Sequence, residues 1–362
     1  MAINARIRTM AAEFRGYSQQ LQFLMSAGPL TKEILTSVGS GNGTPSPATW
    51  TVKRIISVDF ARAVIAVGPP ESPQATAVIK ISRNRDAATN MERERNALRK
   101  LRSDPRLIRL LSILPAEVAW GTIGDQKFLV QQALPGTDAR NLLDDPTRCA
   151  RMQTAALDTV ALLHAITAQT VTVDRALTAR WVDGPLRQIL ELGSSYPRIA
   201  RQAQGLERLG AALTGALLGR RMVVALLHGD FFPGNILVTP DGRSVTGLVD
   251  WDLSAPDELP VLDAMQLLIG IHLVRARSEL GPAVLALLDG GGFTAGEVDS
   301  LMFAQSRLGG DGVGFREAVW LTWLRHIASN LTKSAHFSRH RWWVRENVEA
   351  VLESLSGAER VA

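Results

Sequence analysis

One stretch in the second half of the chain constrains the rest more than any other. An apolar run typical of a buried strand ends at His228-Gly229-Asp230, and four residues separate the aspartate from Asn235. Ile236–Thr239 and Ser244–Val249 then fit two strands joined by a Pro-Asp-Gly-Arg turn, and Asp250 ends the second strand. The hairpin therefore predicts that three side chains with oxygen atoms, two carboxylates and one amide, converge at one point.

The side chains of this cluster suit phosphoryl transfer. Mg²⁺ binds one or two carboxylates and amide oxygens, and it keeps other positions for phosphates and water. A remaining carboxylate can accept the proton of an attacking hydroxyl group. These are the parts that phosphoryl transfer needs: a positioned nucleophile, a bridging metal and neutralised charge. A two-metal hydrolase lacks its ligands here, because no D-x-H precedes the segment and no G-H or H-x-H follows it.

The motif resembles the catalytic core of the aminoglycoside phosphotransferase/choline kinase family, through His228-Gly229-Asp230, Asn235 and Asp250-Trp251. This resemblance implies an α+β, bilobal protein-kinase-like fold, with a small β-rich N-lobe that has one key helix and a larger, mainly helical C-lobe. It also implies that Asp230 is the catalytic base, that His228 braces the loop, and that Asn235 and Asp250 hold the metal. Asp263 resembles a later aspartate of the family and is expected to be structural.

The family pattern also requires a Lys on a strand and a Glu on the helix that follows. Lys80 lies in a Val-Ile-Lys-Ile run that matches the kinase V-A-I-K pattern. Glu94 and Glu92 both lie on the predicted helix, but Glu94 shares its face with Leu98, whereas Glu92 shares its face with charged and polar residues. We therefore predict that Glu94 points inward and pairs with Lys80. By the resemblance, the Lys80 ammonium contacts the α- and β-phosphates of the nucleotide.

The N-terminal part is interpreted as a nucleotide-binding lobe. Its elements are predicted as strands over 49–58, 62–67, 76–82 and 127–132 and a helix near 90–102. By the resemblance, backbone groups near Gln131 and Ala133 meet the edge of adenine or guanine. Two segments remain candidates for covering the phosphates: Ser57–Ala61, which has no glycine, and the GSGNG string at 39–43.

The residues before this lobe form a separate region. Apolar residues repeat there at alternating spacings of four and three, which is the heptad seam of an amphipathic helix: Ile3, Ile7, Met10, Phe14, Tyr17, Leu21 and Leu24. Such a helix either lies on the body of the protein or binds a second copy or another partner. The Gly/Ser/Pro-rich stretch Ser37–Ala48 predicts a linker. We therefore divide the chain into 1–48 (helix and linker), 49–134 (nucleotide-binding N-lobe) and 135–362 (catalytic and acceptor-binding C-lobe).

Composition excludes several classes of protein. The net charge of +5 is mild for 362 residues, and no Lys/Arg block with interleaved aromatic residues accompanies it, so we expect no nucleic-acid partner. No apolar run has the length of a membrane span. Cys149 is the single cysteine, which excludes an intramolecular disulfide and a cysteine-based zinc site. These features together predict a cytoplasmic protein.

Two functions remain open. The first is a small-molecule kinase that uses Mg²⁺ and ATP or GTP to phosphorylate a hydroxyl group of a sugar, an aminoglycoside or an amino alcohol. The second is a catalytically degenerate nucleotide-binding or scaffold protein that acts through its heptad helix. The presence of all five residues of the family pattern favours the first function: Lys80, Glu94, Asp230, Asn235 and Asp250. The phosphate loop without glycine favours the second. The Trp/His/Arg-rich stretches at 320–323 and 340–345 either line the acceptor site or pack between helices.

Overall fold

The chain folds into two compact units. The computed structural model describes residues 28–39 and 47–356. The first unit comprises the residues up to Ser103 and Leu114–Leu134, and the second comprises Asp104–Ile113 and the residues from Pro135 on. A β-rich part thus precedes a mostly helical part, which confirms the α+β fold class. The predicted heptad helix lies outside the described residues.

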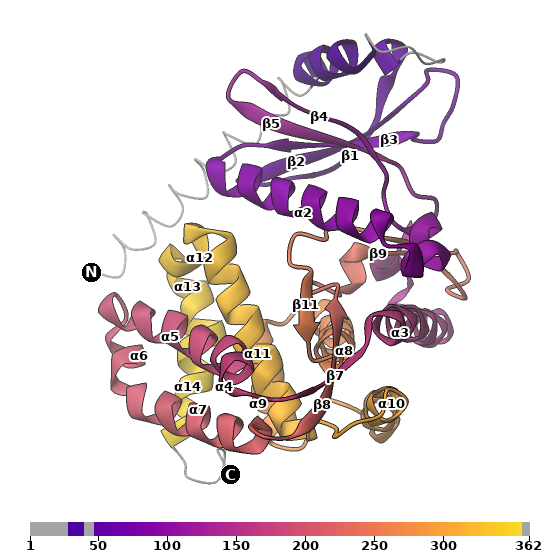
Figure 1. Cartoon of the computed structure of the whole chain (residues 1–362). Coiled ribbons are helices and arrows are strands. Elements are labelled where there is room, and N and C mark those ends of the chain that lie inside the picture. The colour runs from indigo at the N-terminus through magenta and orange to yellow at the C-terminus, as the bar shows by residue number, and fades with distance from the viewer. Residues whose placement is uncertain (1–27, 40–46, 357–362) are drawn as a thin grey trace. The chain divides into compact units, whose positions relative to one another are not determined.

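A five-stranded antiparallel sheet forms the frame of the first unit, in the order β1-β2-β3-β5-β4 (Figure 1). Its strands are β1 (Thr51–Val58), β2 (Arg62–Gly68), β3 (Ala77–Ser82), β4 (Glu117–Ile123) and β5 (Gln126–Gln132). The sequence analysis did not predict β4, which is half-exposed and lacks a buried apolar face. It pairs with β5 through a tight turn in which Gly124 has a φ of +54°, a conformation that favours glycine.

The two faces of this sheet are covered by different helices, because side chains alternate along each strand. Ile79 and Ile81 are fully buried in a core that includes Ile34 of a helix over residues 28–39. Lys80, between them in sequence, points to the other face, where helix α2 (Arg85–Ser103) packs against β3 and β5. Figure 1 shows one helix on each side of the sheet.

Two boundaries in this unit differ from the predictions. The helix over 28–39 includes the first three residues of the predicted linker, because Val38 packs against the core beside Leu35. Helix α2 begins at Arg85, earlier than predicted, because Asn84 caps it: the Asn84 Oδ1 accepts a hydrogen bond from the amide of Ala87 at 2.8 Å.

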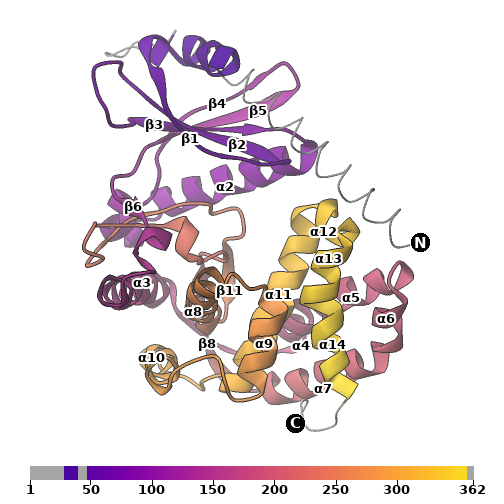
Figure 2. The ribbon, with the colours of Figure 1, turned by 180° about the vertical axis from the view of Figure 1, so that it is seen from behind.

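The second unit is built around helices α8 and α11, which pack against each other (Figure 2). Helix α8 is apolar around most of its circumference and is correspondingly buried. The longer helices are α3 (Pro146–Thr167), α5 (Gly184–Glu191), α7 (Ala203–Leu217), α8 (Val261–Ala276), α9 (Leu280–Leu288), α10 (Ala295–Ser306) and α11 (Phe315–Lys333). Shorter ones are α4 (Arg175–Thr178), α6 (Pro197–Arg201), α12 (Ala335–Arg339), α13 (Arg341–Val344) and α14 (Ala350–Glu353).

Two small sheets frame the segment that carries the motif. One has the order β11-β8-β7, with β7 (Gln169–Thr172), β8 (Arg221–Leu227) and β11 (Ala255–Glu258). The other has the order β10-β9-β6, with β6 (Thr137–Asp138), β9 (Ile236–Val238) and β10 (Val245–Leu248). The predicted hairpin is thus confirmed, with slightly shorter strands. In the part of the chain that the structure describes, no helix has the length and apolar character needed to cross a membrane.

Candidate active site

In the first unit, Lys80 and Glu94 form a buried ion pair. The Lys80 Nζ lies 2.7 Å from Glu94 Oε1 and 2.8 Å from Oε2, and the two side chains are 4% and 1% exposed. The partner is the glutamate on the apolar face of α2, as the helical pattern predicted. A charge pair this far from solvent persists only when its geometry is good, and bonds to both carboxylate oxygens meet that condition.

The Gln131 side chain is buried beside the Lys80–Glu94 ion pair and bonds to it. This side chain is 3% exposed, and its Nε2 donates a hydrogen bond to Glu94 Oε1 at 3.2 Å. The backbone near it is also engaged, because the amide of Ala133 donates to the carbonyl of Thr76 at 2.9 Å. The Ala133 amide is therefore already used within the sheet.

The predicted loop at Ser57–Ala61 is shorter in the structure: β1 ends at Val58 and β2 begins at Arg62, so only Asp59–Ala61 connect them. Asp59 organises this connection, since its Oδ1 accepts hydrogen bonds from the amides of Ala61 at 2.6 Å and Arg62 at 2.8 Å. The Asp59 carboxylate thus occupies amides that a Gly-rich phosphate loop would leave free for a phosphate. The alternative candidate, GSGNG, lies outside the described residues apart from Gly39.

In the second unit, the catalytic-loop motif is anchored on Asp263 of α8. The Asp263 carboxylate accepts hydrogen bonds from the amides of His228 at 2.8 Å and Gly229 at 2.9 Å, and it contacts His164 Nε2 at 3.1 Å. Burial raises the pKa of Asp263, but the His164 hydrogen bond, the two histidines and the Gly229 amide outweigh burial and hold this pKa below its ordinary value. Asp263 thus holds the backbone of the loop at His228 and Gly229, which is the structural role expected for it.

His228 joins this loop to the end of β10. Its Nδ1 accepts a hydrogen bond from the amide of Asp230 at 3.3 Å, so its Nε2 carries the proton and donates to the carbonyl of Val249 at 3.0 Å. Its ring also contacts the buried Trp251 ring, with 4.4 Å between centroids. These bonds are those of a brace, and they couple the position of Asp230 to that of the neighbouring Asp250.

Two amide side chains hold the Asp230 carboxylate. Asn235 Nδ2 donates to Asp230 Oδ2 at 3.1 Å and to the Asp230 carbonyl at 2.8 Å. Gln266 Nε2 donates to Asp230 Oδ1 at 3.2 Å, and Gln266 Oε1 accepts from the amide of Phe231 at 3.2 Å. Both carboxylate oxygens are therefore oriented while the side chain remains partly exposed. The sequence analysis did not identify Gln266, although it lies three residues after Asp263 and thus on the same face of α8.

Asn235 and Asp250 are brought together by the β9–β10 hairpin. The amide of Val249 donates to the carbonyl of Asn235 at 3.0 Å, which places Asp250 beside Asn235. Because Asn235 Nδ2 is committed to Asp230, its Oδ1 is turned away from that carboxylate, and it accepts no hydrogen bond from the described residues. Asp250 has a φ of +63°, which is uncommon for a residue with a side chain. One amide oxygen and one carboxylate fit the oxygen-ligand preference of Mg²⁺.

Helix α11 also contacts the loop that contains Gly229 and Asp230, a contact that the sequence analysis did not predict. Arg325 donates through Nη1 to the carbonyl of Gly229 at 2.6 Å and through Nη2 to the carbonyl of Leu253 at 3.0 Å. Further along α11, the Lys333 Nζ lies 2.9 Å from Asp252 Oδ2. Burial lowers the pKa of His326 on the same helix, and the Asp230 carboxylate opposes this effect only in part.

Gly229 admits no side chain. Its φ is +84°, and a Cβ at this position would overlap the carbonyl oxygen of Leu253. We expect Gly229→Ala to lower the free energy of unfolding by about 3 kcal/mol, measured by urea denaturation. Gly215→Ala on α7 is the matched control, because a Cβ there has no neighbour within 4 Å and should stabilise the helix slightly. Equal stability of the two variants would contradict this account of the loop.

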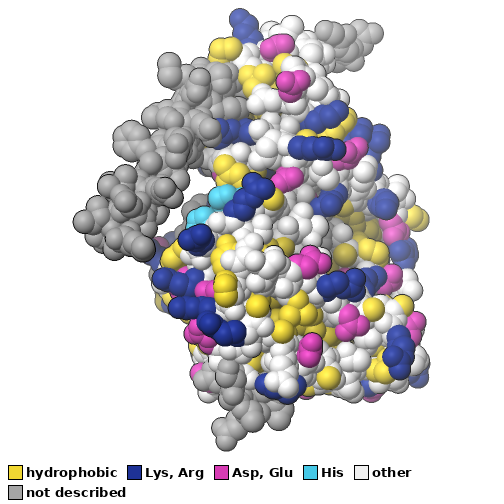
Figure 3. All heavy atoms as spheres, turned by 90° about the vertical axis from the view of Figure 1, so that its left-hand side faces the viewer, with side chains coloured by type: hydrophobic (Ala, Val, Ile, Leu, Met, Phe, Trp, Pro, Cys, Tyr) yellow, Lys and Arg dark blue, Asp and Glu magenta, His cyan; other side chains and the backbone are white. Residues whose placement is uncertain are grey.

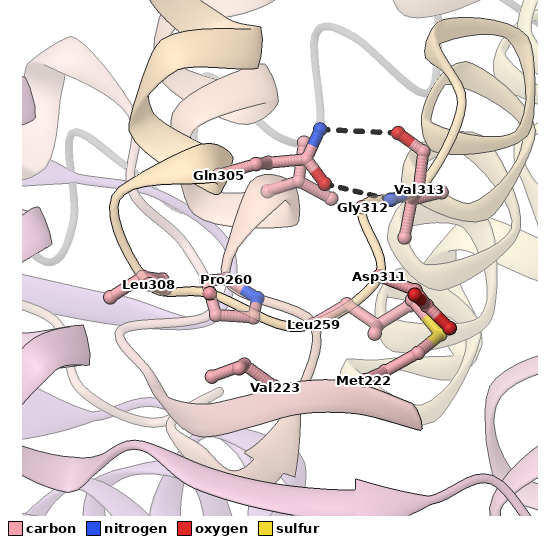
Figure 4. A pocket seen from close by; sticks show the side chains of 11 residues that line it. Met222, Val223, Leu259, Pro260, Gln305, Leu308, Asp311, Gly312 and Val313 are labelled. Carbon is pink, nitrogen blue, oxygen red and sulfur yellow. Dashed lines mark hydrogen bonds between the residues drawn. The ribbon is translucent and has the colours of Figure 1, made fainter. Parts of the chain in front are cut away.

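A separate pocket in the second unit contains none of these residues (Figure 4). It has a volume of about 20 Å³, room for about one water molecule, and apolar side chains line most of it. Two of its lining residues have polar side chains. Gln305 is bonded at both ends of its amide to the backbone of Val313, at 3.2 and 3.0 Å, and Asp311 accepts a hydrogen bond from the amide of Arg221 at 3.2 Å. This pocket is part of the packing between β8 and α10.

Comparisons with known proteins agree with this geometry. A sequence model described as the phosphotransferase enzyme family matches residues 54–297, about two thirds of the chain. No curated protein matches the sequence. Among solved structures, a thermostable mutant of aminoglycoside phosphotransferase APH(4)-Ia in its apo form is 12% identical, with a TM-score of 0.53 and coverage of 85% of this chain and 96% of the other.

Two further structures have the same architecture. APH(3'')-Id from Streptomyces rimosus in complex with ADP and streptomycin is 16% identical, with a TM-score of 0.50 and coverage of 83% and 98% of the two chains. ADP-bound APH(2'')-Ib is 14% identical, with a TM-score of 0.51 and coverage of 85% and 93%. At these identities the likeness is one of fold.

Proposed function

Because the chain belongs to the phosphotransferase enzyme family, we propose that it is a small-molecule kinase that uses Mg²⁺ and ATP or GTP and has Asp230 as its base. Membership of the family makes it a phosphotransferase that acts on hydroxyl groups. The finer assignment rests chiefly on one observation: Asp230 is partly exposed, and both of its oxygens are oriented by neighbouring amides. A carboxylate held in this way is suited to accept a proton from a bound hydroxyl.

The proposed reaction transfers the γ-phosphoryl group of the nucleotide to the hydroxyl group of the acceptor. The acceptor oxygen forms a bond to the γ-phosphorus while the bond from that phosphorus to the bridging oxygen of the nucleotide breaks, and the hydroxyl proton passes to Asp230. Asn235 and Asp250 would hold the metal, through Asn235 Oδ1 and the Asp250 carboxylate. When bound there, Mg²⁺ would neutralise charge on the phosphates. The brace from His228 to Val249 keeps these two parts of the site in register.

The nucleotide-binding role falls to the first unit. Lys80 is the proposed contact for the α- and β-phosphates. Glu94 holds its ammonium in place, and Gln131 donates a hydrogen bond to Glu94. The edge of the nucleobase is proposed to meet the Ala133 carbonyl and the Leu134 backbone, because the Ala133 amide is used within the sheet. The structures bound to ADP support a nucleotide co-substrate for this fold.

Gln266 provides a test of how Asp230 is oriented. We expect Gln266→Met to lower kcat about tenfold and to leave the KM for the nucleotide unchanged, because the substitution frees Asp230 Oδ1 without touching the first unit. Steady-state kinetics with varied nucleotide measures this. Gln305→Met is the matched control, since that amide bonds to the backbone of Val313 and to Met302 Sδ and to no residue of the motif. A rise in nucleotide KM with an unchanged kcat would show that Gln266 does not position the base.

The proposed function has a direct test. Calorimetry should detect binding of ATP or GTP that requires Mg²⁺. A nucleotide-consumption screen against sugars, aminoglycosides, nucleosides and amino alcohols should then yield an acceptor. Absence of Mg²⁺-dependent nucleotide binding would refute the kinase assignment.

A further inference from the structure

The segment that follows the middle of α11 has an unusual charge pattern. Residues 318–345 contain five Lys or Arg and three His, but no Asp or Glu. The segment covers most of α11, all of α12 and all of α13. Such a stretch, in a chain whose total charge is only +5, concentrates positive charge on one part of the second unit.

Helix α11 brings this segment to the proposed base. Arg325 is bonded to the carbonyl of Gly229, the residue before Asp230. Lys333, two turns further along the helix, is paired with Asp252. The end of α11 and the start of α12 therefore lie beside the motif.

Beyond Lys333 the positive groups are exposed. Arg339 and Arg341 are exposed, and neither forms an ion pair with any described residue. His340 lies between them in sequence, and its ring contacts those of His336 and Trp342, with centroid distances of 5.2 and 6.3 Å. Figure 3 shows the face on which α12 and α13 lie, where histidine side chains appear beside those of Lys and Arg.

The carboxylates on the neighbouring elements do not cancel this charge. Asp252 is already paired with Lys333, and Glu346 with Arg345. Burial raises the pKa of Tyr196, and Arg341 and Glu349 act on this pKa in opposite directions, so Glu349 is the acidic group that opposes Arg341 in this effect. Arg339 has no such counterpart among the described residues. The surface of α12 and α13 thus keeps an excess of positive charge, and it includes a Trp342 ring that is 50% exposed.

We propose that this surface, formed by Arg339, His340, Arg341 and Trp342, binds an anionic group of the acceptor, so that the substrate is a hydroxyl compound with a carboxylate or phosphate. This inference rests on the proposed kinase function. Arginine recognises both anions through paired hydrogen bonds, and an exposed indole can stack on a sugar or base ring. A polycationic aminoglycoside would instead need free carboxylates here, and the charge pattern disfavours it.

The experiment compares acceptors that differ in one group only. The pairs are glucose and glucuronate, glucose and glucose 6-phosphate, and a nucleoside and its monophosphate, with kanamycin as a polycation. Binding is measured by calorimetry in the presence of Mg²⁺ and a non-hydrolysable nucleotide, and turnover by nucleotide consumption. We expect the anionic member of at least one pair to bind about tenfold more tightly than its neutral partner, and the advantage to fall as salt rises. The carboxylate and phosphate pairs separate the two kinds of anion.

Charge-reversal variants locate the effect. Arg339→Glu with Arg341→Glu should remove the advantage of the anion and leave binding of the neutral partner unchanged. Arg275→Glu with Arg307→Glu is the matched control, because these exposed residues lie at the ends of α8 and α10 and change the total charge equally. The milder pair Arg339→Gln and Arg341→Gln gives the same test if the reversal unfolds the protein.

The outcomes separate this inference from the proposed function. Equal binding within every pair, or tightest binding of kanamycin, would overturn the anionic acceptor while phosphoryl transfer still stood. Loss of the preference in the control variant would also overturn it. Preferred binding of the anionic member by a protein that shows no Mg²⁺-dependent nucleotide binding would support the anion site and refute the kinase function.

Discussion

Replacing Asp230 with Asn is expected to lower kcat by about 10³-fold, while Mg²⁺-dependent nucleotide binding remains. The loss follows because an amide cannot accept the hydroxyl proton, and general-base catalysis contributes about 10²- to 10⁴-fold. Nucleotide binding should survive because Lys80 and the proposed metal ligands are unchanged. Asn is the suitable replacement, since its Oδ1 can still accept a hydrogen bond from one of the two amides that hold Asp230, those of Asn235 and Gln266.

The measurement combines single-turnover kinetics with calorimetry. Asp241→Asn is the matched control, because Asp241 lies in the exposed β9–β10 turn and its carboxylate bonds only to Thr239 and its own turn. It should leave kcat unchanged. Phosphoryl transfer by the Asp230 variant at the rate of the unaltered protein would show that another group is the base.

Replacing Lys80 with Met is expected to reduce both stability and nucleotide binding. It leaves the Glu94 carboxylate buried without its cation, and such a loss costs about 3–5 kcal/mol. The double variant Lys80→Met/Glu94→Gln should recover most of this stability, because a neutral amide can still accept the hydrogen bond from Gln131. It should not recover Mg²⁺-nucleotide binding, if the ammonium contacts the phosphates.

Urea denaturation and calorimetry separate the two effects. The Arg95→Met/Glu117→Gln variant is the control, because that pair lies in the same unit but is 20% and 25% exposed and should contribute about 1 kcal/mol or less. Nucleotide affinity in the double variant equal to that of the unaltered protein would mean that Lys80 is only structural.

Much of the candidate site could be predicted from local patterns. The spacing from Asp230 to Asn235 and Asp250, with turn residues between, specifies a hairpin whose two ends meet. The choice of Glu94 over Glu92 follows from the helical period, which decides which face of α2 is apolar. These are short-range properties, because they depend on residues a few positions apart on one strand or helix.

The remaining contacts join residues that are far apart in the chain. Gln266 lies 36 residues from Asp230, and Arg325 lies 96 residues from Gly229, so no sequence period connects them. The weakly patterned strand β4 was missed for a related reason, since pairing with β5, and not an apolar face of its own, stabilises it.

The sequence by itself determined the reaction class and predicted the groups proposed to carry it, because this motif consists of residue types at fixed local spacing. Only the tertiary structure decided what orients those groups and what lies beside them. Helices α8 and α11 pack against each other and contact the loop at 228–230, so Gln266 of α8 and Arg325 of α11 lie near Asp230. Arg325 belongs to the segment 318–345, which has no Asp or Glu. The packing of these helices follows from which apolar faces bury each other, a property of the whole second unit and not of any single stretch.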